Sequence, residues 1–161
     1  NVIAKMRSIN SHVGAWAPMA EQHAVAAFFK NENAVENWFV HFKKEIAFRL
    51  DAIYNGIKTM ADEGLPIEAI PPQAAIYLTL QINLVGRKTA NGKILNSQEE
   101  VTAYILNEAR LAIVPFYAFG ASKKSAWYRL SVGCSKKEEI DEMLHMLKTA
   151  LEKTSKVEAL A

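Results

Sequence analysis

Cysteine is nearly missing from this sequence, which has Cys134 alone among its 161 residues. One thiol excludes an internal disulfide framework and a zinc site built from cysteines. The histidines lack the paired spacing of metal ligands, so we expect no metal site; they are His12, His23, His41 and His145. A single free thiol fits a reducing compartment, and we therefore expect a cytoplasmic protein.

An excess of charge of one sign and long apolar runs are lacking too. Lysine and arginine number 19 and acidic residues 17, giving a net charge of +2, and basic residues never occur in runs longer than two. This balance provides no basic surface for nucleic acid, so we expect no nucleic-acid partner. Because there is neither an apolar run of about 18 residues nor a signal peptide at the start, we expect no membrane association.

The composition that is present is that of a globular protein. Half of the residues are hydrophobic and 22% are charged, which is typical of one domain with a substantial core. The sequence opens at Asn1, without an initiator methionine, and goes directly into a helical pattern. We therefore expect a piece of a longer protein.

The clearest local pattern predicts a helix over residues 33–63. Asn33 and Glu36 have the spacing of a capping box, and apolar residues follow at steps of three and four along one face. Gly64 and Pro66 mark its end. We expect the aromatic residues on this face to lie in the core: Trp38, Phe39 and Phe42.

Strand and helix patterns alternate after this helix. Alternating apolar residues predict strands over 75–82 and 126–133, and a short apolar run predicts a buried strand over 111–116. Capping boxes predict a helix over 97–110 and a last helix that begins near Ser135.

This order predicts an α+β fold, a small α/β sandwich with its short sheet covered on one face by helices. The long helix over 33–63 leads into it. We expect three parts: a helical interdomain lead-in over 1–30, a small domain over 31–155 and a tail over 156–161.

Arg129 is the residue with the most informative position, because it lies in the middle of the predicted strand 126–133. Alternation places Tyr128 and Leu130 on the core face and Arg129 on the other face. A guanidinium that is removed from water needs an anion, and its planar fork matches a carboxylate through two parallel hydrogen bonds. From the residues alone, a ligand site, an internal salt bridge and an exposed edge position all remain open.

Four short motifs follow one another along the chain: Ser11-His12 followed by Gln22, Pro72 to Leu78, Val114 to Gly120, and Tyr128 to Ser131. In this order they resemble the carboxy-terminal part of the class I and II aminotransferases that use pyridoxal phosphate, which are of the aspartate aminotransferase type. The resemblance covers about residues 8 to 153 and implies the small-domain fold of that family.

The resemblance also implies roles for residues. Arg129 matches the arginine that binds the α-carboxylate of the amino-acid substrate and the 2-oxo-acid product. The candidates for the pocket wall are Trp16, Phe116, Tyr117, Phe119 and Gly120. Phe116 stands where the family usually has glycine, so the resemblance does not carry the substrate class over.

Several parts of the complete enzyme are expected outside this chain. The lysine that forms the Schiff base with pyridoxal phosphate, and the phosphate-binding motif, match no segment before Ser11. The resemblance therefore implies a large cofactor-binding domain in the same chain and a homodimer. We expect no catalytic residue in the present sequence, no covalently bound cofactor and no activity by itself.

Two other functions remain open. If Asn1 begins the natural protein, a stand-alone α+β module that binds a small carboxylate or a protein, without catalysis, is favoured. A related pyridoxal-phosphate lyase or synthase of the same fold would share the carboxylate-binding arginine and differ only upstream.

Overall fold

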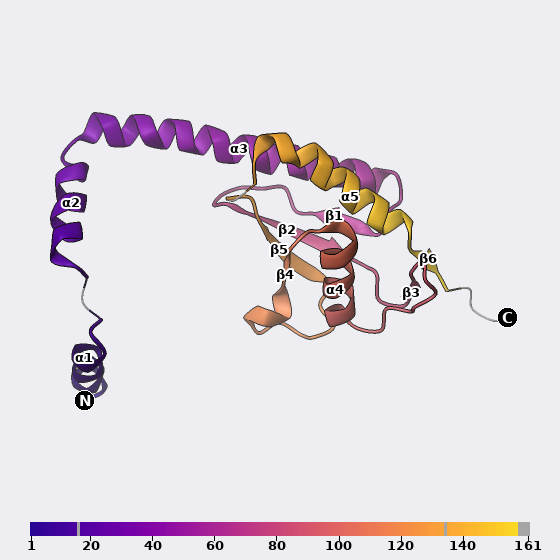
Figure 1. Cartoon of the computed structure of the whole chain (residues 1–161), viewed down its shortest axis with the longest axis horizontal. Helices are drawn as coiled ribbons and strands as arrows, with labels where there is room; N and C mark the ends of the chain where they lie inside the picture. The colour runs from indigo at the N-terminus through magenta and orange to yellow at the C-terminus, as the bar shows by residue number, and fades with distance from the viewer. Residues whose placement is uncertain (16, 134, 158–161) are drawn as a thin grey trace. The chain divides into compact units, whose positions relative to one another are not determined.

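The computed structural model describes residues 1–15, 17–133 and 135–157 (Figure 1). The chain divides into two compact units, Asn1–Lys43 and Lys44–Ala161. No helix in the described ranges is both long enough and apolar enough to cross a bilayer.

The first unit is helical, as the sequence predicts. It contains α1 (Val2–Val13), α2 (Met19–Phe29) and the beginning of α3 (Glu32–Asp62). The prediction that Asn33 and Glu36 cap α3 is wrong. The helix begins earlier, and the Asn31 side chain accepts a hydrogen bond from the Ala34 amide at 3.3 Å, the usual geometry of an N-cap.

The three aromatic residues that the sequence places in the core are exposed, which corrects that prediction. Trp38, Phe39 and Phe42 keep 53%, 42% and 38% of their surface accessible. They contact one another instead: the rings of Trp38 and Phe42 stack with centroids 4.8 Å apart, and Phe39 meets Trp38 edge-on. The spacing of apolar residues identifies an apolar face of a helix, but it does not show whether other segments of the same chain pack against that face.

The second unit contains a four-stranded antiparallel sheet. Its order is β1-β2-β5-β4, so β2 (Tyr77–Ile82) and β5 (Trp127–Ser131) are the central strands. Both match predicted strands. The edge strand β4 (Val114–Pro115) is shorter than predicted, and the other edge strand, β1 (Ile67–Ala69), is not predicted.

Helices cover one face of this sheet, which confirms the predicted α+β sandwich. The carboxyl-terminal half of α3, α4 (Gln98–Ala109) and α5 (Ile140–Glu152) bury their apolar residues with those of the central strands in one core. The alternation predicted for β5 is confirmed, because Tyr128 and Leu130 are buried there. The opposite face of the sheet, which carries Arg129, is only half covered.

Helices α3 and α5 run close together over the sheet (Figure 1). Gly56 of α3 allows this approach, because a Cβ atom at that position would overlap the side chain of Leu144 on α5. A larger side chain at this position would require the Leu144 side chain to move.

A second, two-stranded sheet connects the end of the described chain to its middle. Strands β3 (Arg87–Lys88) and β6 (Ser155–Lys156) are antiparallel. The Arg87 guanidinium donates hydrogen bonds of 2.9 Å and 2.8 Å to the hydroxyl and the carbonyl oxygen of Thr154. The predicted capping role of Ser135 is wrong, because a 3-10 turn, η2 (Lys137–Glu139), precedes α5, and neither η2 nor α5 has a side-chain hydrogen bond at its N-cap.

Ala75, just before β2, has a left-handed backbone with φ of 63°. This conformation costs a non-glycine residue about 1–2 kcal/mol. Glycine removes that strain but increases the entropy of the unfolded chain, so we expect Ala75→Gly to raise the free energy of unfolding by about 0.5–1 kcal/mol. Urea denaturation followed by circular dichroism measures the change.

The neighbouring substitution Ala74→Gly is the matched control, because Ala74 does not have a positive φ. There only the entropic cost applies, and we expect a loss of about 0.5–1 kcal/mol. Changes of the same sign in both variants would contradict the strain at Ala75.

Candidate functional site

The candidate site is centred on Arg129 in the middle of the sheet. Its strand, β5, pairs with β2 on one side and with β4 on the other, where Thr79 and Val114 are its register partners. Because Tyr128 and Leu130 face the core, Arg129 projects from the face without helices. The side chain is half-buried.

Two aromatic rings contact the guanidinium group of Arg129. Its Cζ atom lies 4.4 Å from the centroid of the Tyr77 ring and 4.4 Å from that of Phe119. Tyr77 belongs to β2, and Phe119 ends the 3-10 helix η1 (Phe116–Phe119) that follows β4. The rings therefore come from the elements on both sides of β5. Both remain exposed, Tyr77 at 40% and Phe119 at 57%.

The guanidinium has no internal counter-ion in the described ranges. Every ion pair found there joins other residues, and none includes Arg129. The sequence alone left an internal salt bridge open, and within residues 1–15, 17–133 and 135–157 it is not formed. Cation–π contacts leave the edge of the guanidinium, with its N–H donors, available to a planar acceptor such as a carboxylate.

The other residues expected at the pocket wall lie in and after η1. Phe116 and Tyr117 belong to this turn, and Tyr117 is half-buried there. Gly120 ends the turn with φ of 90°, and its amide donates to the Tyr117 carbonyl oxygen at 3.1 Å. This conformation requires glycine or a strained residue. Trp16, the remaining candidate, lies outside the described residues.

Tyr77 is the site residue that sequence reasoning missed. It was identified only as part of a strand motif. The alternation of residues in β2 places Tyr77 and Thr79 on one face of that strand. Because Thr79 pairs with Arg129, this face and the Arg129 face of β5 lie on the same side of the sheet. To infer that Tyr77 lies near Arg129, one also has to know the register between β2 and β5, which pairs Tyr77 with Ser131, two residues from Arg129.

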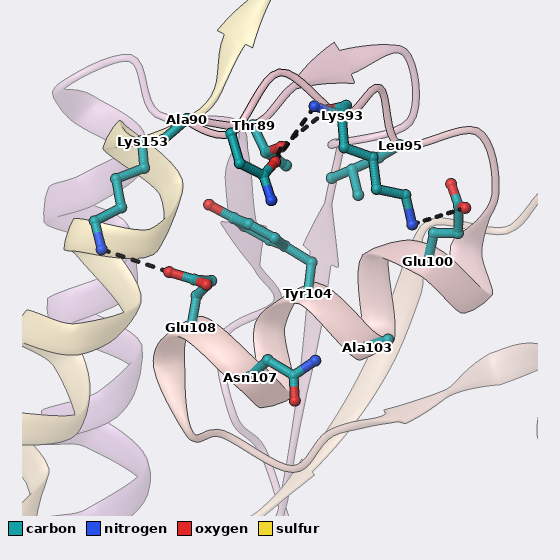
Figure 2. Close-up of a pocket in the computed structure, with 11 residues that line it drawn as sticks. Thr89, Ala90, Lys93, Leu95, Glu100, Ala103, Tyr104, Asn107, Glu108 and Lys153 are labelled. Carbon is teal, nitrogen blue, oxygen red and sulfur yellow. Dashed lines mark hydrogen bonds and ion pairs between the residues drawn. The ribbon is translucent and has the colours of Figure 1, made fainter.

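A separate cavity lies between α4, the turn after β3 and the end of α5 (Figure 2). It has a volume of about 310 Å³. Its charges are already paired: Lys153 contacts Glu108 at 3.4 Å, and Lys93 contacts Glu100 at 3.0 Å. Figure 2 shows Tyr104 between these two pairs. Since each lysine has a carboxylate partner, the cavity provides no free cation comparable to Arg129.

In the described part of the chain, no three histidine, cysteine or acidic side chains are grouped so that they could hold a metal ion. Lys123 and Lys124, which follow Gly120, are exposed. The Arg129 guanidinium, with two aromatic rings in contact and no ion-pair partner in the described residues, is an arrangement suited to binding an anion.

The known proteins that are similar in sequence to this chain include aspartate and aspartate/prephenate aminotransferases. No protein-family model matches the chain. A probable aspartate/prephenate aminotransferase from Rickettsia bellii (strain RML369-C) is 34% identical over 80 residues, which cover 49% of this chain and 19% of that protein. The chain thus spans about a fifth of the length of this curated relative.

Solved structures of similar fold include several aminotransferases. The aspartate aminotransferase from Rhizobium meliloti matches with a TM-score of 0.59 and 26% identity, covering 70% of this chain and 26% of that one. LysN, an α-aminoadipate aminotransferase from Thermus thermophilus in complex with N-(5'-phosphopyridoxyl)-L-leucine, matches with a TM-score of 0.69 and 16% identity. That match covers 94% of this chain and 35% of LysN, and it concerns the fold alone.

Proposed function

We propose that this chain, which is similar to aspartate aminotransferases, is the small domain of a pyridoxal-phosphate-dependent aminotransferase and provides the carboxylate-binding side of its substrate pocket. Its ligands there are an amino acid and the corresponding 2-oxo acid. The observation that carries the proposal is the Arg129 guanidinium, which lies on the open face of the sheet between two elements with aromatic residues and has no ion-pair partner in the described residues.

Arg129 would bind and orient the substrate. A substrate that is held through its nitrogen needs a second point of attachment, so that the Cα–H bond keeps the direction required for proton removal. Two parallel hydrogen bonds from the guanidinium to the α-carboxylate supply that attachment. Closure of the domain over the bound substrate, with residues Phe116 to Gly120 at the pocket wall, would exclude water.

Pyridoxal phosphate, when bound, supplies the electron sink for amino-acid chemistry. The described residues around Arg129 do not fit this cofactor, because the contacts of the guanidinium are aromatic rings and the nearby Lys123 and Lys124 are exposed. We therefore assign the cofactor to a large domain of the same polypeptide.

The remaining parts of the proposal concern the organisation of the complete enzyme. We infer a lead-in over 1–30, the small domain over 31–155 and a tail over 156–161, joined to the large domain. We also infer a cytoplasmic homodimer. These inferences rest on the resemblance of the sequence motifs and on the single cysteine.

The present chain alone is expected to lack transaminase activity. Mixing it with pyridoxal phosphate should give no stoichiometric aldimine absorption band, because it has no lysine in a cofactor site. Borohydride reduction followed by mass spectrometry of tryptic peptides measures any adduct. Modification concentrated on one lysine would contradict the proposal, whereas slow labelling spread over exposed lysines is the background that any protein gives.

The genomic reading frame before Asn1 separates this proposal from a stand-alone binding module. A pyridoxal-phosphate domain encoded in the same frame supports the aminotransferase, and its absence supports the module. A related lyase or synthase is then distinguished by assaying the complete enzyme for amino-group transfer to a 2-oxo acid.

A further inference from the structure

The geometry points to Tyr77 and Phe119 as positioning residues. Their contacts restrict the conformation of the Arg129 side chain before the substrate carboxylate binds. This inference deepens the proposed function and rests on it. It gives Phe119 a more specific role than that of pocket wall, and it adds Tyr77, which acts through Arg129 and need not touch the substrate.

The sheet register explains how the two rings reach the arginine. Tyr77 pairs with Ser131 and therefore lies diagonally across from Arg129 on the same face of the sheet. On the other side of β5, β4 pairs with Arg129 through Val114, and the chain then turns through η1 to bring Phe119 back. Both Cζ–centroid distances are 4.4 Å, within the range of a cation–π contact.

An unrestrained arginine side chain has many rotamers, and ordering them on binding reduces affinity. Two rings supplied by separate elements restrict the guanidinium before the ligand arrives. Each ring centroid lies 4.4 Å from the Cζ atom, and a cation–π contact of this kind leaves N–H donors for the two hydrogen bonds to a carboxylate. The rings also replace water near the charge, which strengthens those hydrogen bonds.

The exposure of the two rings supports a function for them. Tyr77 and Phe119 are large apolar side chains that remain 40% and 57% accessible, so burial in the core of the domain does not account for their positions. They come from two of the motifs that carry the resemblance, Pro72 to Leu78 and Val114 to Gly120. These motifs therefore meet in space at the residue of the fourth motif, Arg129.

The test uses the complete aminotransferase that contains this chain. Tyr77→Leu and Phe119→Leu remove a ring and keep apolar volume, while Tyr77→Phe and Phe119→Tyr keep the ring. We expect each leucine variant to raise KM for the amino acid and lower kcat/KM about five- to thirtyfold. The variants that keep a ring should stay within about twofold of the parent enzyme, since the cation–π contact is retained.

The same leucine substitutions in an Arg129→Ala background complete a double-mutant cycle. If the rings act through the guanidinium, they have no further effect once it is gone. A full additional loss in that background, or leucine variants equal to the parent, would overturn the positioning role. If Arg129→Ala itself leaves kcat/KM unchanged, the proposed function fails instead, so the two failures are distinguishable.

A spectroscopic measurement on the present chain checks the contact without catalysis. Ring currents from Tyr77 and Phe119 should shift the Nε–H proton of Arg129 upfield of those of the other arginines. Each leucine variant should move this signal toward the others, whereas Tyr77→Phe should not. A signal that is unchanged in both leucine variants would contradict the contact.

Discussion

Replacing Arg129 by alanine in the complete aminotransferase is expected to lower kcat/KM for its amino acid by about thirtyfold to several thousandfold. This corresponds to about 2–5 kcal/mol of transition-state binding, the cost of removing one partner from a desolvated charge pair. Steady-state kinetics with a range of amino-acid concentrations measures the loss. The cofactor absorbance should not change, because no described contact of Arg129 involves a cofactor-binding group.

Lys124→Ala is the matched control for this experiment. It removes one positive charge from an exposed position in the same segment, and we expect kcat/KM to stay within about twofold of the parent value, since surface charges act weakly. Arg129→Lys should recover only part of the activity, because an ammonium group lacks the planar fork. An alanine variant with the kinetics of the parent would refute the role of Arg129.

Removing the hydroxyl of Tyr128 is expected to change the stability more than either glycine substitution before β2, and to lower it. Tyr128 is fully buried, and its hydroxyl donates a 2.7 Å hydrogen bond to the side-chain oxygen of Gln98, which is also buried. In Tyr128→Phe that oxygen loses its donor. The free energy of unfolding should fall by about 1–3 kcal/mol at neutral pH, measured by urea denaturation.

The same variant should alter the dependence of stability on pH. Burial raises the pKa of Tyr128 from 10.0 to about 12. The folded state therefore keeps a proton that the unfolded chain releases from about pH 10, so the contribution of this group is full below pH 10 and declines as pH rises toward 12.

The difference in stability between the parent and Tyr128→Phe should accordingly shrink between about pH 10 and pH 12. Tyr77→Phe is the matched control for the loss of a hydroxyl group, because Tyr77 lies at the surface and outside the core. A difference that stays constant across this range would mean that the Tyr128 phenol is not protected from ionisation.

Much of the fold could be predicted because its main elements carry strong local patterns. Helix α3 has a continuous apolar face and is followed by Gly64, and β2 and β5 alternate clearly enough to identify the core face. The residue that caps the start of α3 was not predicted correctly. Both Asn31 and Asn33 can cap a helix, and only the hydrogen bond from the Ala34 amide to the Asn31 side chain decides between them.

The parts that could not be predicted depend on contacts between distant segments. Strands of two or three residues, such as β3 and β6, have no periodicity to detect and exist because a partner strand is nearby. The exposure of Trp38 and its neighbours depends on what covers α3, which spacing does not reveal. Arg129 was identifiable from its position in a strand, whereas the contribution of Tyr77 required the register between β2 and β5.

The placement of β5 between β2 and β4 has a consequence for the order of folding. Both neighbours precede β5 in the chain, and its pairing with β2 joins Tyr77 to Ser131 across all of β3, α4 and β4. During synthesis the middle of the sheet stays open until Ser131 has left the ribosome. Pairing over such separations slows folding, so β5 pairs late, and β4 has no partner in the sheet until it does.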